Sequence, residues 1–146
     1  MSKYFKLKKS DKYLSKCLYF TSNALARKLT KLAEEAFIPL GLSPSYAFLI
    51  LLVYENPGIT PSALSVELNL DPSTITRLAD KMILRSLIKK EKNGKTMHFQ
   101  PTEALTKLLP ELEKCWFDLK DSYDNILGVN AANILVDLTF KASEKI

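Results

Sequence analysis

Residues 71–85, with the sequence DPSTITRLADKMILR, constrain the fold more than any other stretch of the chain. Asp71 can cap a helix, and Pro72 suits the first helical position because proline lacks the N–H that would be unpaired there. A helix over residues 72–86 would have one polar face and one apolar face. The apolar face carries Ile75, Leu78, Ala79, Met82 and Ile83, at spacings of three and four. Such a helix packs one side against a core and presents the other side to solvent or to a partner.

The polar face of this helix has a composition that suits DNA. Small hydroxyl side chains occupy the first turn, and Arg77 and Lys81 follow them. A helix with a small, hydrogen-bonding first turn and a cationic flank can enter a major groove. An ordinary amphipathic helix with a solvated face would show the same pattern, so the neighbouring segments must decide between the two interpretations.

The segments before this helix complete a helix-turn-helix. A capping residue followed by proline occurs three times, at Ser43-Pro44, Thr60-Pro61 and Asp71-Pro72. The first pair opens a helix over 46–54 that is apolar on all sides, which predicts the buried centre of the fold. The second pair opens a short helix over 61–68, and Asn69 can then adopt the left-handed conformation of a tight turn. Two short helices joined by a three-residue turn form the motif.

A β-hairpin is predicted immediately afterwards, over residues 87–99. Asn93-Gly94 is a strong signal for a two-residue type I′ turn. This register would pair Ile88 with Phe99 on the buried face and would place Lys92 opposite Lys95 at the tip. Like charges that face each other destabilise a ladder, but at a solvated tip they could hold a phosphate between them. A hairpin that follows a helix-turn-helix is a wing.

Long helices flank this unit on both sides. Leucines spaced by three, four and seven predict a helix from about Asp11 to Ala36, after a basic arm at residues 1–10. From Thr102 a heptad-like stripe runs to Ile126, Gly128 ends that helix, and Asn130 is expected to cap a last one. The central unit cannot cover these stripes alone, so a two-fold homodimer would bury them. Its two recognition helices would lie about 34–36 Å apart.

The sequence therefore predicts a mainly α fold with a small β-hairpin wing. We expect a single domain over residues 1–146, in which 37–100 form a winged helix-turn-helix lobe that binds DNA. Residues 1–36 and 101–146 would form the flanking dimerisation helices.

The distribution of charge agrees with a polyanionic partner. Residues 1–36 hold nine basic and three acidic side chains, and residues 77–100 hold seven basic and two acidic ones. The segments 37–76 and 101–146 are each net −3. Positive charge is thus concentrated in the first segment and from Arg77 onward, as a nucleic-acid-binding protein would require.

Several other classes of function are disfavoured. The four glycines are isolated, so the chain has no phosphate-cradling loop, and the single histidine, His98, is expected at the surface of the wing without a paired base. Two distant cysteines form neither a disulfide framework nor a zinc site. The longest apolar run, 46–54, is too short to cross a bilayer. We expect no catalytic residue, no metal, no cofactor and no membrane, in a cytoplasmic protein with reduced thiols.

The stretch LSPSYAFLILLVYENPGITPSALSVELNLDPSTITRLADKMILRSLIKK, residues 42–90, resembles the multiple antibiotic resistance regulator (MarR) family. The resemblance rests on the phrases Asn-Pro-Gly, Thr-Pro-Ser-x-Leu and Asp-Pro-Ser-Thr-x-Thr-Arg-Leu in series. It implies a bacterial homodimeric winged-helix repressor that responds to small phenolic ligands or oxidants. The chain departs from the family pattern in two places. The wing lacks the usual Asp-x-Arg, and Ser86 replaces the usual glycine before it.

The resemblance and the helix pattern together give the expected sites. Hydroxyls and cations should contact double-stranded DNA, with Asp80 orienting Arg77 rather than touching DNA. The expected DNA-binding residues are Thr60, Ser62, Ser73, Thr74, Thr76, Arg77, Lys81, Lys92 and Lys95.

Two further sites and two alternative functions follow. A pocket where the first, second and fifth helices meet, near Arg27, Tyr46 and Trp116, would suit a small aromatic effector that carries a carboxylate. The alternative is that these three are ordinary core and interface residues. Some family members sense peroxides through a cysteine near tyrosines in the first helix, where this chain has Cys17. A single cysteine is also a common small buried hydrophobe, and Cys115 is expected only to pack. The alternatives to a DNA-binding regulator are a winged-helix interaction module without specific DNA binding and a thiol-based redox sensor.

Overall fold

The computed structural model describes residues 11–146, and the expected basic arm at residues 1–10 lies outside this range. The chain is mainly helical with one two-stranded antiparallel sheet, as predicted. The elements are α1 (Asp11–Leu14), α2 (Leu18–Phe37), the 3₁₀ turn η1 (Ile38–Leu40), α3 (Pro44–Glu55), α4 (Pro61–Leu68), α5 (Pro72–Leu84), β1 (Ile88–Asn93), β2 (Thr96–Pro101), α6 (Glu103–Leu127) and α7 (Val129–Ser143).

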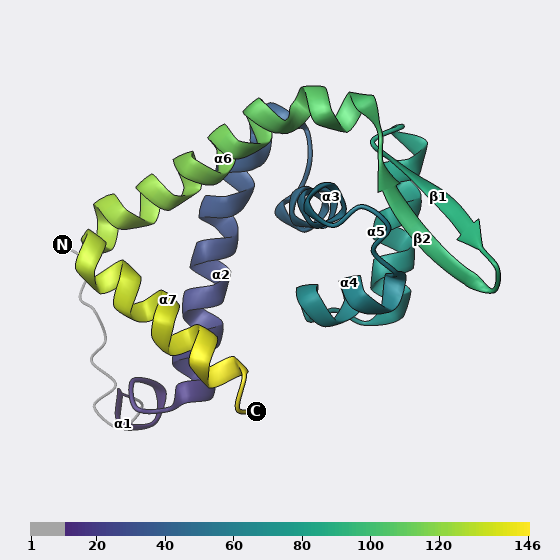
Figure 1. Cartoon of the computed structure of the whole chain (residues 1–146). Coiled ribbons are helices and arrows are strands. Elements are labelled where there is room, and N and C mark those ends of the chain that lie inside the picture. Colours follow the sequence, from purple (N-terminus) through teal and green to yellow (C-terminus); the bar gives the residue numbers. More distant parts are fainter. Residues whose placement is uncertain (1–10) are drawn as a thin grey trace.

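Two parts of the molecule can be distinguished (Figure 1). We call α3 to β2, residues 44–101, the lobe. The long helices α2 and α6 extend away from it, and α7 folds back from the end of α6. We call the part remote from the lobe the distal arm. It consists of residues 11–30 (α1 and the first part of α2) and residues 120–143 (the end of α6 and all of α7).

The core of the lobe forms around α3, as the sequence predicts. Ala47, Leu49, Ile50 and Val53 of α3 are buried. Helices α4 and α5, the hairpin and the first half of α6 surround them with further buried side chains. These include Leu64, Ile75, Leu78, Met82, Ile88, Phe99, Leu105 and Leu112. The predicted apolar stripe of α5 is thus confirmed.

The turn between α4 and α5 has the predicted geometry. Asn69 adopts φ +52°, and its N–H donates to the carbonyls of Ser65 and Val66 at the end of α4. Asparagine tolerates this left-handed conformation better than most residues. Three residues, 69–71, therefore redirect the chain from α4 into α5, which completes the helix-turn-helix.

The first long helix differs from the prediction, because it is interrupted. A short helix, α1, ends at Leu14, and Cys17 has an extended backbone (φ −101°, ψ 115°) at the N-cap of α2. The leucine spacing continues across the interruption, so periodicity alone did not reveal it. The last helix also starts earlier than expected, because Gly128 rather than Asn130 occupies its N-cap.

Among residues 11–146 no single helix is long and apolar enough to cross a membrane. Helix α2 with η1, taken together with α3, satisfies that criterion only as a pair bent by 65°.

Candidate DNA interface

Helix α5 is held in one rotational position by its buried stripe. Ile75, Leu78, Ala79 and Met82 are buried against the lobe core, which turns the opposite side of the helix to solvent. Asp71 occupies the N-cap in an extended conformation, but its carboxylate makes no capping hydrogen bond, so that part of the prediction is wrong. The helix ends at Leu84, two residues before the predicted end.

The hydroxyls predicted to contact DNA fall into two groups. Thr60 accepts a hydrogen bond from the Ala63 N–H at 3.2 Å and caps α4, and the Thr76 hydroxyl donates to the Pro72 carbonyl at 3.1 Å. Ser62, Ser73 and Thr74 make no side-chain hydrogen bond to any of residues 11–146. Ser62 and Ser73 are exposed and Thr74 is half-buried. These three hydroxyls are therefore available to a ligand, while Thr60 and Thr76 already have a local partner.

The charged side chains of α5 do not interact as predicted. Asp80 accepts a hydrogen bond from Lys90 Nζ of β1 at 2.6 Å, so its partner is a wing lysine and not Arg77. The register of β1 brings Lys90 to the solvent side of α5, where Asp80 also lies. Arg77 is exposed and forms no ion pair with a described residue. Lys81 Nζ lies 5.6 Å from the centroid of the Tyr46 ring, which makes a cation–π contact with α3.

The hairpin has a different register from the predicted one. Asn93 pairs with Thr96 and Lys92 pairs with Met97, so Lys92 does not face Lys95. Gly94 and Lys95 form the two-residue turn, and only Gly94 of the two has a positive φ, +64°, as the first central position of a type II′ turn requires. The predicted pairing of Ile88 with Phe99 is also wrong, because Ile88 pairs with Pro101 and Phe99 with Lys90. A shift of two residues preserves the alternation of faces, so Ile88 and Phe99 are both buried as predicted.

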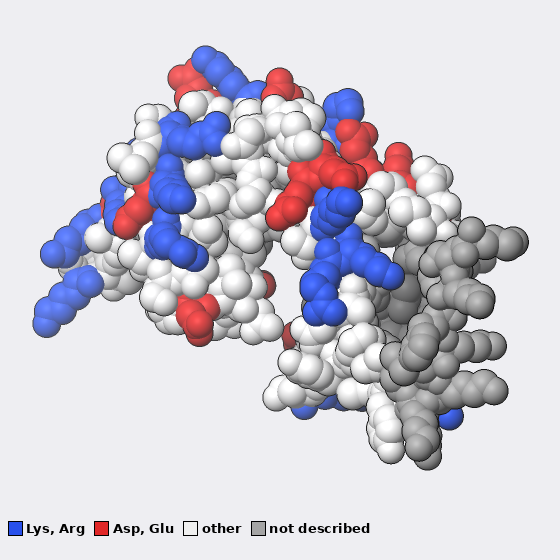
Figure 2. Space-filling model, turned by 180° about the vertical axis from the view of Figure 1, so that it is seen from behind, with Lys and Arg blue, Asp and Glu red and all other residues white. Residues whose placement is uncertain are grey.

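The wing presents its cations to solvent. Lys89, Lys90, Lys92 and Lys95 are all exposed, and Figure 2 shows basic side chains projecting from the hairpin end of the molecule. Lys89 Nζ lies 2.9 Å from Glu91 Oε1, and this hydrogen bond lowers the pKa of the Glu91 carboxyl. The two lysines predicted to bind DNA, Lys92 and Lys95, form no ion pair within residues 11–146.

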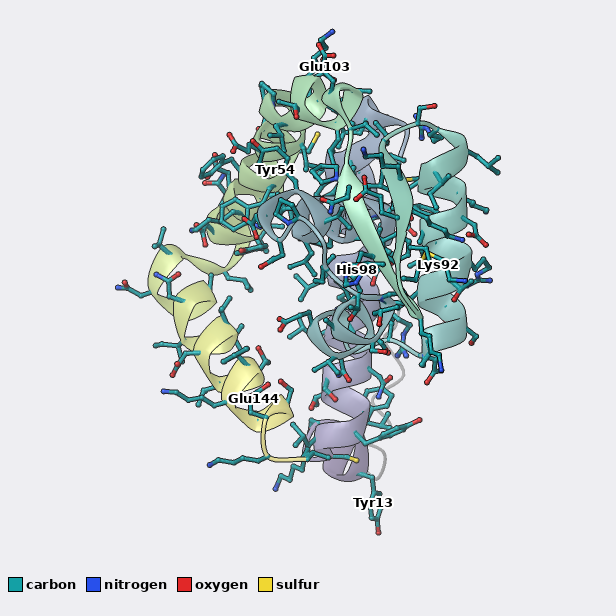
Figure 3. All side chains as sticks on the ribbon, turned by 45° about the vertical axis from the view of Figure 1, so that its right-hand side comes forward. Tyr13, Tyr54, Lys92, His98, Glu103 and Glu144 are labelled. Carbon is teal, nitrogen blue, oxygen red and sulfur yellow. The ribbon has the colours of Figure 1, made fainter. Side chains whose placement is uncertain are left out.

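The base of the wing is fixed by the segment that follows α3. His98 is half-buried rather than a surface residue, because its Nδ1 lies 2.7 Å from the Gly58 carbonyl oxygen. The Gly58 N–H donates to the Phe99 carbonyl at 2.8 Å, and the Phe99 N–H donates to the Ile59 carbonyl at 2.9 Å. Figure 3 shows His98 on the hairpin, where it turns toward this segment. No residue pattern indicated this anchor in advance, because its partners are backbone groups.

The three residues predicted to share a ligand pocket do not meet. Trp116 lines a cavity of about 410 Å³ to which Arg27 and Tyr46 do not contribute. Tyr46 lies instead beneath Lys81, and Arg27 is exposed on α2. The prediction treated α2, α3 and α6 as meeting at one point. Arg27 lies in the part of α2 that belongs to the distal arm and does not reach the cavity.

The two cysteines have opposite environments. Cys17 is exposed at the interruption between α1 and α2, so it is not a buried hydrophobe. Its aromatic neighbours Tyr13 and Tyr19 are also exposed, and Figure 3 shows Tyr13 pointing away from the helices. Cys115 is buried, and desolvation raises the pKa of its thiol. Within residues 11–146 no group of three or more metal-binding side chains is gathered.

Comparison with known proteins identifies the same segment that carries this interface. A model described as the MarR family matches residues 40–96, from η1 to the start of β2. The chain is similar to an uncharacterized HTH-type transcriptional regulator, YybA, of Bacillus subtilis (strain 168), with 30% identity over 93 residues. That match spans 62% of this chain and 62% of the relative.

Solved structures share the fold over most of the chain. The transcriptional repressor CouR bound to p-coumaroyl-CoA superposes with a TM-score of 0.82 at 16% identity, over 91% of this chain and 96% of that one. CouR bound to a 23-mer DNA duplex gives the same TM-score and identity, over 89% and 94% of the two chains. The segment that forms the helix-turn-helix and the wing is thus similar to the MarR family, and the chain shares its fold with the CouR structures.

Proposed function

We propose that this protein is a homodimeric, DNA-binding transcription regulator of the bacterial cytoplasm that represses from a pseudo-palindromic operator. The observation that carries the proposal is the orientation of α5. Its apolar stripe is buried in the lobe, and its solvent side presents the free hydroxyls of Ser73 and Thr74 together with unpaired Arg77. Arginine reads guanine in the major groove, and small hydroxyls contact phosphates or base edges.

The wing would supply a second, less specific contact. Lys92 and Lys95 are exposed near the hairpin tip, where they can neutralise phosphates beside the groove that α5 enters. The chain lacks the arginine with which the family usually reads a narrow minor groove. A lysine is a compact point charge, so this wing would contribute affinity more than sequence preference.

The distal arm supports the dimer. Ile134 and Leu138 lie on one side of α7 and Val136 and Phe140 on the other, and all four are more than half exposed. A second chain would remove such large apolar side chains from water. A two-fold axis through this arm would pair two lobes, as binding of α5 to successive major-groove faces requires. We therefore assign residues 37–100 to DNA binding, and residues 1–36 and 101–146 to dimerisation.

Binding to the DNA upstream of the protein's own coding region, titrated against salt and competitor DNA, tests the proposal. Arg77→Ala should cost about 1–3 kcal/mol of specific affinity if Arg77 reads a base. The double variant Lys92→Ala/Lys95→Ala should reduce the salt slope by about one unit for each phosphate that the wing no longer neutralises. Lys107→Ala is the matched control, because Lys107 is an exposed lysine on α6 that pairs only with Glu103.

The outcomes separate the proposal from its alternatives. Competitor-resistant binding that Arg77→Ala weakens and Lys107→Ala leaves unchanged supports a sequence-reading regulator. Weak binding that competitor DNA abolishes, unaffected by Arg77→Ala, would favour the interaction module instead. Binding that peroxide treatment abolishes in the unaltered protein but not in Cys17→Ser would favour the redox sensor, whose candidate thiol is exposed.

A further inference from the structure

An open pocket of about 320 Å³ lies between the start of α3 and the last turns of α5. We call it the α3–α5 pocket. Two cations line it, Lys81 and Arg85, and none of the described residues that line it is acidic. Its lining also includes two polar residues and two buried apolar ones, which are Ser43, Tyr46, Leu42 and Met82. The pocket is therefore a basic recess in the surface of the lobe.

Arg85 is held in place at this pocket before any ligand binds. Its Nη1 donates a hydrogen bond to the Gly41 carbonyl at 3.1 Å. That bond uses a single N–H of the guanidinium, so the other N–H groups are available. Arg85 forms no ion pair with a described residue. Because the side chain is already fixed, Arg85 loses less conformational entropy than a free arginine when it binds an anion.

Lys81 supplies the second cation, one helical turn before Arg85. Its Nζ lies 5.6 Å from the centroid of the Tyr46 ring and has no carboxylate partner among residues 11–146. The neighbouring acid on α5, Asp80, is already bound to the wing. Residues four apart lie on one side of a helix, so Arg77, Lys81 and Arg85 form a row along α5. Figure 2 shows basic side chains one above another over this part of the lobe, beside those of the hairpin.

The start of α3 brings a free hydroxyl to the same pocket. Ser43 occupies the N-cap of α3, but its side chain makes no capping hydrogen bond and is exposed. A phosphate group carries several oxygens that accept charge-assisted hydrogen bonds from different directions. Two uncompensated cations and a free hydroxyl around one recess match those requirements.

We propose that the α3–α5 pocket binds a phosphate group, and that this group belongs to the backbone of the DNA that α5 reads. Lys81 and Arg85 neutralise the phosphate, and Ser43 donates a hydrogen bond to it. The contact joins α3 and α5 to the same strand, so it fixes the orientation of α5 on the duplex. It carries no base information and strengthens binding to any sequence. The assignment of DNA as the source rests on the proposed function, but binding of a phosphate group does not.

The salt dependence of DNA binding tests the site. The full-length protein is titrated with the upstream DNA and with an unrelated duplex of equal length, over a range of salt concentrations. Arg85→Gln should weaken binding to both duplexes by about tenfold and reduce the salt slope by about one unit. The ratio of the two affinities should stay unchanged, whereas Arg77→Ala should reduce it. Arg27→Gln is the matched control, because Arg27 is also exposed and without an ion pair to a described residue, but lies on α2 in the distal arm.

A second variant and a second probe complete the test. Lys81→Gln leaves the hydrogen bond between Arg85 and Gly41 in place, so it decides the question if Arg85→Gln fails to fold, and it should show the same loss on both duplexes. To detect binding of a free phosphate, ¹⁵N-labelled protein is titrated with sodium phosphate and with sodium chloride at equal ionic strength. Binding at this pocket should shift the amide signals of Ser43 and Arg85 saturably with phosphate only.

Each outcome supports or overturns the site. Equal weakening on both duplexes in Arg85→Gln or Lys81→Gln, absent from Arg27→Gln, supports a DNA phosphate. Unchanged DNA binding, with phosphate shifts that Lys81→Gln removes, supports a free phosphate group as the ligand. No effect in either assay, weakening on the upstream DNA alone, or an equal loss in Arg27→Gln overturns the site. A protein without preference for the upstream DNA contradicts the proposed regulator, but the unrelated duplex and the phosphate titration still decide whether the pocket binds phosphate.

Discussion

The lobe and the distal arm differ sharply in how they treat apolar side chains. The connected core of buried residues lies entirely between Phe37 and Cys115. Among the described residues of the distal arm, only Ala132 is a buried hydrophobic residue. The arm instead exposes twelve large hydrophobic side chains, which are Tyr13, Leu14, Leu18, Tyr19, Phe20, Ile126, Leu127, Val129, Ile134, Val136, Leu138 and Phe140.

This difference shows that the lobe, together with the end of α2, η1 and the first half of α6, completes a core, whereas the distal arm does not. Both parts have strong helical periodicity in the sequence. In the lobe short elements of different orientation close around α3, whereas in the arm α7 covers only part of α2 and α6. A cavity of about 130 Å³ remains between these three helices. The arm's apolar surface is therefore available to a second copy of the chain, as the proposed dimer requires.

Truncation of matched side chains on α4 should show how self-sufficient the lobe is. Leu64 is fully buried and Val66, on the same helix, is 78% exposed. Leu64→Ala should lower the free energy of unfolding by about 2–5 kcal/mol because it leaves a cavity in the core, and Val66→Ala should change it by less than about 0.5 kcal/mol. Urea denaturation followed by circular dichroism measures both. Equal losses would mean that the lobe core is not closed as described.

The two thiols should report the same contrast kinetically. Cys17 is exposed in the distal arm, whereas Cys115 is buried and its pKa is raised by desolvation. With a chromogenic disulfide reagent at pH 8, one equivalent of thiol should react at once. The second should react about a hundredfold or more slowly, because Cys115 must wait for an opening that costs ~3 kcal/mol. Cys17→Ser should remove the fast phase only. A fast phase that survives in Cys17→Ser would place Cys115 at the surface.

The apolar surface of the arm should affect association rather than folding. Phe140 is 64% exposed on α7, and Leu84 is 84% exposed on the lobe. If α7 lies in the dimer interface, Phe140→Ala should raise the dimer dissociation constant by about ten- to a hundredfold, equivalent to about 2 kcal/mol of burial removed. Sedimentation equilibrium over a range of concentrations measures this constant, and Leu84→Ala is the control. An unchanged constant in Phe140→Ala would remove α7 from the interface.

Much of the lobe could be predicted because its determinants are local. The prolines at 44, 61 and 72 and the left-handed Asn69 fix helix starts and a turn within a few residues. The stripe of α5 indicates which side is buried. The hairpin register could not be predicted in this way, because Asn93-Gly94 and Gly94-Lys95 are both reasonable turn pairs and the choice depends on how β2 meets Ile59.

The remaining features depend on groups far apart in the sequence. Lys90 approaches Asp80 only when β1 has packed beside α5. The cavity that Trp116 lines exists only when α6 crosses α3. Neither arrangement leaves a mark on residue spacing. Of the three residues predicted to line one ligand pocket, only Trp116 therefore lines the cavity between α3 and α6.

The junction between α5 and the wing allows the smallest and most local test. Ser86, which occupies the family's usual glycine position, has φ +59°. Two hydrogen bonds hold Ser86 in this conformation. Its N–H donates to the Ile83 carbonyl at 2.9 Å, and the Thr102 hydroxyl donates to the Ser86 carbonyl at 2.7 Å. A left-handed conformation costs a non-glycine residue roughly 1–2 kcal/mol. This is more than the free-energy cost of the extra backbone entropy that glycine loses on folding.

Ser86→Gly should therefore raise the free energy of unfolding by about 0.5–1 kcal/mol in the same urea assay, as glycine removes the strain. Asn69→Gly is the matched control, because Asn69 has a similar φ of +52° but asparagine tolerates it, so its gain should be smaller. Since this junction belongs to the lobe, the dimer dissociation constant should stay unchanged. A destabilised Ser86→Gly protein would mean that the serine side chain contributes more at this turn than its backbone strain costs.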